Sequence, residues 1–138
     1  MYYLYTLSKR KCNGGGKMKD IEYPVILTEY HTEATLRALR EWCMTSLEAM
    51  KEACWENVHG GVDWKPIAEG FLKGILPCMD AHDIIVKRRA EYLHGTEREM
   101  SLLAVEDMKK ARDYMEQIID ELKKAAREQG RPALRVIK

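Results

Sequence analysis

The chain has 138 residues, of which 46% are hydrophobic and 33% are charged. This length fits one domain that buries its core without help from disulfides, and the composition excludes a disordered chain and an integral membrane protein. The formal net charge of +1, from 23 basic and 22 acidic residues, argues against a protein that coats DNA. A local basic patch that contacts RNA is not excluded.

Neither a membrane span nor a signal peptide is expected near the start. The uncharged run Met1–Ser8 is far too short to cross a bilayer. A signal peptide places its basic residues before its apolar stretch, whereas Lys9–Lys11 follow that stretch here. A cytoplasmic location without membrane attachment is therefore the expectation.

The cysteines do not form a recognisable metal or redox motif. No two of them make a Cys-x-x-Cys pair, so a zinc ribbon or a thioredoxin-like site is not expected. Cys43, Cys54 and Cys78 fall on helical apolar stripes, where a reduced cysteine packs as a small hydrophobic residue. The four are Cys12, Cys43, Cys54 and Cys78. No metal and no cofactor is predicted.

The first 27 residues are predicted to be flexible or extended. The aromatic Met1–Leu7 favours a short strand, and the basic, glycine-containing Lys9–Lys17 is typical of a flexible link. Met18 offers a second plausible start of the chain. Pro24 keeps the residues up to Thr28 out of a helix.

A first helix is predicted from Thr28 or Thr32 to about Val58. Apolar residues recur at spacings of three and four, which makes one continuous face. This face comprises Leu36, Leu39, Cys43, Leu47, Met50 and Cys54. The glycines of His59–Gly61 end the helix, because glycine accepts the left-handed conformation of a C-cap.

A second helix is predicted from Asp63, as N-cap, to about His94–Gly95. Pro66 falls in the first turn, where its missing N–H costs nothing. Pro77 lies mid-helix, so the helix is expected to be kinked or broken there.

A third helix is predicted from the capping box Thr96–Glu99 to about Gln129. Its apolar residues keep the same three-four rhythm over the whole length. Gly130 and Pro132 are expected to stop it and leave residues 131–138 as a short tail.

These elements predict an all-α protein: an antiparallel bundle of three long helices over residues 28–130. Three apolar stripes do not enclose a four-sided core. A homodimer that completes the core is therefore expected.

Two polar residues fall on the apolar stripe of the second helix, His82 and Arg89. They lie two turns apart and share a face. A buried guanidinium needs a carboxylate, water or a ligand, unless it reaches solvent at the helix end. His82 is predicted to be a core histidine bonded to a backbone carbonyl or to water.

The stretch Arg88–Gly95, followed by one more long helix, resembles the active-site region of the HEPN superfamily. The resemblance covers residues 67–127 and depends on an arginine, four to six residues and then a histidine, often followed by glycine. Proteins of that superfamily are all-α bundles, many are metal-independent endoribonucleases of toxin–antitoxin or defence systems, and some are non-catalytic. It implies a site at a dimer interface, an RNA substrate and a cognate antitoxin as partner.

The resemblance assigns His94 as acid or base, and Arg89 or Arg88 as the phosphate clamp. If Arg88 is the motif arginine, Arg89 takes the next place, which is usually polar in that superfamily. If Arg89 is the motif arginine, Ala90 takes that place. Both alignments stay open. The roles are chemically coherent, since a histidine near neutrality can move a proton and a guanidinium can hold a charged phosphoryl group.

Two other interpretations remain beside the nuclease. One is a non-enzymatic helical interaction or assembly module that forms homo-oligomers. The other, suggested by Glu29, His31 and Glu33, is a metal-binding bundle, although such bundles need Glu-x-x-His on two helices.

Overall fold

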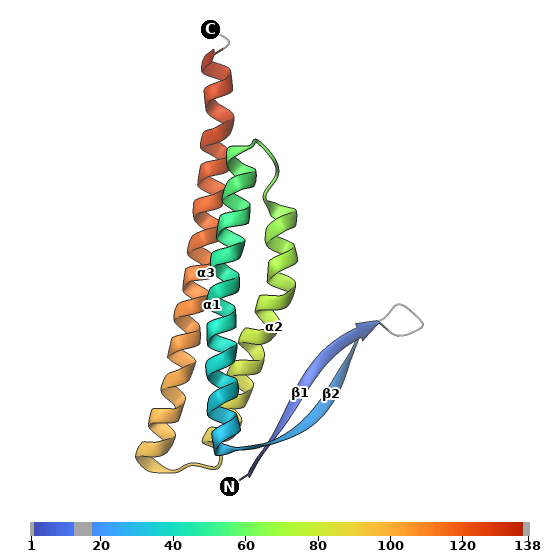
Figure 1. Ribbon diagram of the computed structural model, residues 1–138, viewed down its shortest axis with the longest axis vertical. Helices are drawn as coiled ribbons and strands as arrows, with labels where there is room; N and C mark the ends of the chain where they lie inside the picture. Colours follow the sequence, from blue (N-terminus) through green and yellow to red (C-terminus); the bar gives the residue numbers. More distant parts are fainter. Residues whose placement is uncertain (1, 13–17, 137–138) are drawn as a thin grey trace.

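The computed structural model describes the backbone of residues 2–12 and 18–136, and the side chains of residues 3–5 and 25–129. A two-stranded hairpin precedes three helices. The elements are β1 (Tyr2–Cys12), β2 (Met18–Thr28), α1 (Glu29–His59), α2 (Lys65–Ala90) and α3 (Gly95–Val136). The predicted antiparallel bundle of three long helices is confirmed: α2 runs opposite to α1 and α3 (Figure 1).

The hairpin is the main departure from the predicted elements. β1 pairs antiparallel with β2 over its full length, from Tyr2 opposite Thr28 to Cys12 opposite Met18. The strand therefore runs through Lys9–Cys12, where the sequence predicted a flexible link; the rest of that link, residues 13–17, lies outside the described residues. Pro24 fits because a two-stranded sheet has only edge strands, where a missing N–H is tolerated.

Helix α1 begins and ends with the caps that its sequence predicts. Thr28 is the N-cap, in extended conformation, and its hydroxyl accepts the His31 N–H at 3.2 Å. At the other end Gly61 adopts a φ of +72°, the Val62 N–H donates to the Asn57 carbonyl, and the Gly61 N–H donates to the Val58 carbonyl. This is a Schellman motif, which needs glycine at the left-handed position.

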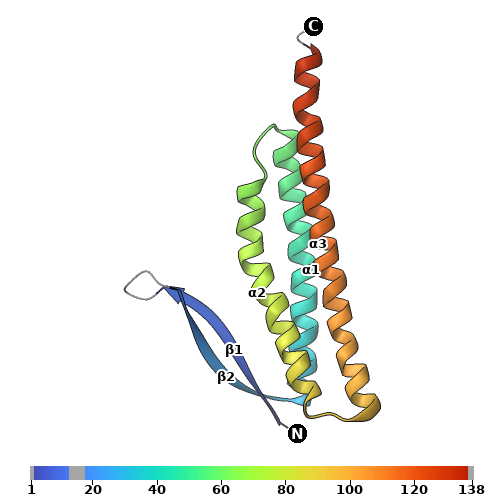
Figure 2. The same ribbon diagram turned by 180° about the vertical axis from the view of Figure 1, so that it is seen from behind.

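Helix α2 differs from the prediction at both ends. It begins at Lys65 after a buried Trp64, and Asp63 contributes a side-chain oxygen that accepts the Lys65 N–H at 3.1 Å. It stays continuous through Pro77 and bends about midway in both views (Figures 1 and 2). It ends at Ala90, before the predicted His94–Gly95. The next three N–H groups bond to carbonyls three residues back instead of four, and this tighter turn ends the α-helix.

Helix α3 continues to Val136, past Gly130 and Pro132, so the predicted stop is wrong. The end of α3 projects beyond α1 and α2 (Figure 1). Water can hydrogen-bond the carbonyl that Pro132 leaves free on such a projecting end, and the helix is not forced to terminate.

The core forms two clusters along the bundle. The larger one fills the bundle body with residues from all three helices, including the predicted stripe residues Cys43, Leu47 and Met50. The smaller one lies at the end where the hairpin joins, and it packs Tyr3 and Tyr5 of β1 against the bundle. Its other buried members are Leu36, Ile85 and Val86. The hairpin is thus anchored at its base, while its far end points away from the helices in both views (Figures 1 and 2).

Candidate functional site

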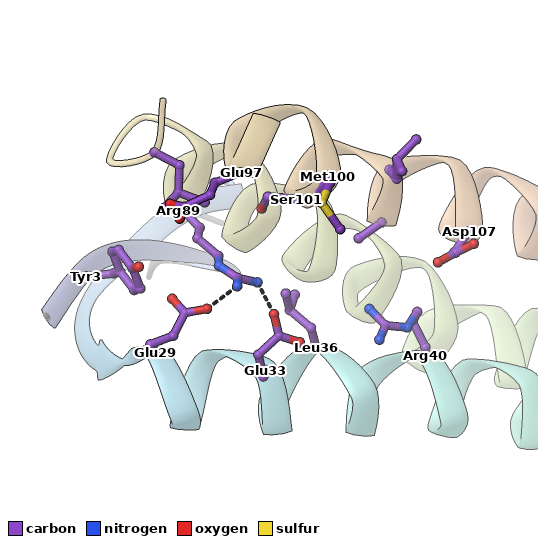
Figure 3. Close-up of a pocket in the computed structure, with 13 residues that line it drawn as sticks. Tyr3, Glu29, Glu33, Leu36, Arg40, Arg89, Glu97, Met100, Ser101 and Asp107 are labelled. Atoms are coloured by element: carbon purple, nitrogen blue, oxygen red, sulfur yellow. Dashed lines mark hydrogen bonds and ion pairs between the residues drawn. The ribbon is translucent and has the colours of Figure 1, made fainter. Parts of the chain in front are cut away.

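At the hairpin end of the bundle the N-terminal parts of α1 and α3 diverge (Figures 1 and 2). A pocket lined by residues of both helices lies there (Figure 3). Its volume is about 670 Å³. β1 and the end of α2 complete the wall. The lining comprises Tyr3, Glu29, Glu33, Leu36, Arg40, Arg89, Leu93, Glu97, Met100, Ser101, Leu103, Ala104 and Asp107.

Arg89 is the central charged group of this pocket. It reaches from α2 toward α1 and pairs with the carboxylates of Glu29 and Glu33, one helical turn apart (Figure 3). Only 13% of its side chain is exposed. Burial disfavours the charged guanidinium, but the two carboxylates outweigh that effect and raise the pKa of Arg89. Arg89 is therefore neutralised from within the chain.

The pocket as a whole is acidic. Four carboxylates line it, against two guanidiniums, which leaves a net charge of −2. Glu97 and Asp107, both on α3, are exposed and make no ion pair with any side chain that the structure describes. Met100 and Leu103, more than 60% exposed, give the α3 side an apolar lip. This combination suits a ligand that is cationic and partly apolar.

Three buried polar atoms of the pocket lack a hydrogen-bond partner. They are Glu29 Oε2, Arg89 Nε and Ser101 Oγ, and among the described residues no other buried side-chain nitrogen or oxygen is in this state. Native proteins leave few such atoms, because each costs about 1–3 kcal/mol. All three residues line this pocket, so the cost of these unpaired atoms falls on its walls.

Tyr3 of β1 lines the pocket on the hairpin side, and Tyr5 lies further along the same strand. Burial and the neighbouring Glu29 raise the pKa of Tyr3 to about 12, so its phenol stays protonated. Tyr5 is fully buried, its hydroxyl lies 3.0 Å from that of Thr32, and burial raises its pKa as well. Neither phenol is poised as a base, and both serve to join the hairpin to α1.

A buried polar network lies just behind the pocket, around His82. Arg40, a pocket residue, lies 3.1 Å from His82 Nε2, while His82 Nδ1 lies 3.2 Å from Asp83. Arg112 on α3 then bonds Asp83 at 2.6 Å and Asp80 at 3.4 Å. The network links all three helices. The predicted backbone or water partner of His82 is therefore replaced by two charged side chains.

Burial lowers the pKa of His82, and the positive charge of Arg40 acts in the same direction. The hydrogen bond to Asp83 opposes both effects without reversing them. His82 is therefore neutral, held in one orientation and closed off from solvent.

The structure does not bring the sequence-predicted site residues into one cleft of a single chain. Arg89 lines the pocket, whereas Arg88 donates to the Leu4 carbonyl at 3.0 Å, pairs with Glu91, and lies over the Tyr92 ring. His94 is exposed, is not part of the pocket lining, and follows the end of α2 rather than lying on it. The expected helical spacing between arginine and histidine is absent because α2 ends at Ala90.

The acidic side chains of the pocket were missed at the sequence level as a group. The sequence suggests Glu29 and Glu33 only as metal ligands with His31, places Glu97 only within the capping box, and gives Asp107 no role. The sequence signal for these carboxylates is Arg89. A guanidinium on an apolar stripe needs a partner, and the fold supplies the carboxylates of Glu29 and Glu33. Nothing in the spacing showed which carboxylates the fold supplies.

The cysteines whose side chains the structure describes, Cys43, Cys54 and Cys78, lie in or against the larger core cluster. In the described part of the chain, no group of three or more histidine, cysteine, aspartate or glutamate side chains is arranged to hold a metal ion. Cys43 and Cys54 are buried as predicted, and burial raises the pKa of both, that of Cys43 to about 11. None of the described helices has the length and apolar character that crossing a bilayer requires.

Comparison of the chain with protein-family models, with curated protein sequences and with solved structures gives no match.

Proposed function

We propose that the chain is a non-enzymatic helical binding and assembly module whose acidic pocket receives a cationic group of a partner protein. One observation carries this proposal: Glu97 and Asp107 are exposed, have no ion partner among the described side chains, and line a pocket whose net charge is −2. A lysine or arginine side chain on a peptide would supply the positive charge that these carboxylates lack. Its charged head donates hydrogen bonds to the two exposed carboxylates.

The electrostatics of the pocket favour this occupant over a phosphodiester. The guanidinium of Arg89 is already offset by Glu29 and Glu33, and Glu97 and Asp107 add negative charge around it. Like charges in a partly desolvated pocket repel strongly, whereas a cation gains from the same field. The aliphatic stem of a lysine or arginine would also cover the apolar lip made by Met100 and Leu103.

The test is a titration of the whole protein into a fluorescent lysine- and arginine-rich peptide, followed by anisotropy. We expect saturable binding that weakens as salt rises, and no binding of a peptide of opposite charge. The double change Glu97→Gln and Asp107→Asn should weaken binding about tenfold, which corresponds to about 1.4 kcal/mol. The matched control is Glu52→Gln with Glu69→Gln, two exposed carboxylates outside the pocket. Equal affinities for both double variants would refute the proposal.

A second candidate function is the HEPN-like endoribonuclease, favoured by the accessibility of His94 and by Arg88, whose side chain is 42% exposed. Arg88 lies in the last turn of α2 and His94 follows four residues after the helix ends, so a second copy could bring a second pair opposite the first. The test is cleavage of a structured RNA without added metal. Loss of cleavage in His94→Ala, with an unchanged melting temperature, would support this function; absence of cleavage by the wild-type protein would remove it.

A further inference from the structure

The hairpin forms an arm whose paired strands lead away from the three helices (Figures 1 and 2). β1 and β2 each have 11 residues, which corresponds to about 35 Å of extended chain. Tyr3, Tyr5, Val25 and Leu27 anchor the base in the smaller core cluster. The rest leads away from the helices (Figures 1 and 2). A two-stranded hairpin is marginally stable alone in water, so an arm of this length needs a surface to lie on.

The far part of the arm is basic in sequence. Over residues 9–12 and 18–20 of the two strands, it carries four basic residues against one acidic residue, Asp20. The basic ones are Lys9, Arg10, Lys11 and Lys19. The pocket at the arm's own base carries the opposite sign, with a net charge of −2. Opposite charges on two parts of one chain raise the rate and specificity of their encounter.

The arm cannot reach the pocket of its own chain. Tyr3 in β1 and Glu29, which follows β2 directly, both line the pocket, so the pocket lies at the base of the arm. The paired strands run away from that base. A second copy is therefore the partner that this charge pattern fits.

Resting on the function proposed above, we propose that two copies exchange arms, so that the basic hairpin end of each lies in the acidic pocket of the other. Such an exchange is reciprocal, which is the requirement for a closed two-fold dimer. Glu97 and Asp107, exposed and not paired among the described side chains, meet the incoming basic residues.

Charge reversal with sedimentation equilibrium on the full chain tests the exchange. One variant reverses the arm (Lys9→Glu, Arg10→Glu, Lys11→Glu) and another reverses the pocket (Glu97→Lys, Asp107→Lys). Each variant alone should dissociate at least about tenfold more readily than the wild-type dimer. An equimolar mixture of the two should re-form a dimer, because the acidic arm then meets the basic pocket and the basic arm meets the acidic pocket.

The control is Glu52→Lys with Glu69→Lys, which changes the net charge as the pocket variant does but lies outside the pocket. It should leave the dimer unchanged, and circular dichroism should show equal helix content in all variants. A wild-type monomer at about 100 µM, a dimer indifferent to arm reversal, or a mixture that stays monomeric would each overturn the exchange.

These outcomes separate the arm exchange from the binding function. If the wild-type protein is monomeric but binds the basic peptide through Glu97 and Asp107, the exchange is wrong and the proposed function stands. If the peptide does not bind to the monomer either, both are wrong.

Discussion

Arg40 on α1 donates a hydrogen bond to Nε2 of the buried His82 on α2, with 3.1 Å between the two nitrogens. A guanidinium has no acceptor, so this contact requires that Nε2 carry no proton. The proton of the neutral ring then lies on Nδ1 and points to Asp83 Oδ1, 3.2 Å away. The acidic pocket and the centre of the bundle thus share one residue, Arg40, which lines the first and bonds into the second.

Replacing His82 by glutamine should flatten the dependence of stability on pH. Burial lowers the pKa of His82 in the folded chain, so between that value and 6.5 the unfolded chain binds more protons. Above about pH 6.5 the free energy of unfolding is therefore not reduced by His82. As the pH falls from there toward the folded pKa, protonation of His82 in the unfolded chain lowers the free energy of unfolding. Each unit of difference between the two pKa values corresponds to about 1.4 kcal/mol.

The measurement for His82 is the free energy of unfolding in urea at pH 7.5 and pH 5. The wild-type protein should lose more stability between these two values than His82→Gln does. His59→Gln, at an exposed helix end, is the matched control and should behave as wild type. An identical loss in all three proteins would contradict a neutral, closed-off His82.

Replacing Arg89 by alanine should destabilise the protein by about 1–3 kcal/mol. Breaking a buried ion pair leaves a carboxylate uncompensated, and the cost here is reduced because Glu29 and Glu33 are almost half exposed. Arg88 has a side chain that is 42% exposed and pairs with the exposed Glu91, so Arg88→Ala should cost less than about 1 kcal/mol. Chemical denaturation of the two variants under the same conditions checks this order; the reverse order would show that Arg89 is not the central charge of the pocket.

Two glycines of α2 give a matched pair for the packing between α1 and α2. A methyl group at Gly70 meets nothing within 4 Å, so Gly70→Ala should stabilise the helix by about 0.5–1 kcal/mol. The same group at Gly74 would lie 3.2 Å from the Trp42 ring and would force that ring to shift. Gly74→Ala should therefore gain less than Gly70→Ala, or lose stability. Thermal unfolding followed by circular dichroism measures the stability of both variants. Equal gains in stability would mean that Trp42 does not lie beside Gly74.

The thiols of Cys43 and Cys54 should not react with a thiol reagent in the folded protein at pH 8. Both are fully buried, and the raised pKa leaves little thiolate in either. Mass spectrometry of peptides after labelling should find these two cysteines modified only in denaturant. Rapid modification of Cys43 in the native protein would mean that α1 and α2 separate on that time scale.

The bundle could be predicted because its signals are local. The three-four spacing of Leu36, Cys43 and Leu47 requires one buried helix face, and Thr28 and Gly61 fix the ends of α1 through their own backbone geometry. The long hairpin could not be predicted in the same way, since pairing residues 2–12 with 18–28 depends on contacts at the base that Tyr5 makes with Thr32.

The candidate site was only half predictable for the same reason. A stripe position showed that Arg89 needs a partner, but Glu29 lies 60 positions away in sequence and meets it only in the folded chain. The predicted end of α2 is too late because Glu91–His94 continue a helical pattern in sequence, whereas the N–H groups of residues 91–93 bond to carbonyls three residues back. That difference of one turn is what separates His94 from the pocket.

The most direct test of the acidic pocket is carbodiimide labelling of carboxylates in the full-length protein, resolved by residue with mass spectrometry, with and without saturating basic peptide. Bound peptide should protect Glu97 and Asp107 and leave Glu52 and Glu69 as reactive as before. Uniform labelling of all four carboxylates, unchanged by the peptide, would contradict a pocket that receives a cationic partner.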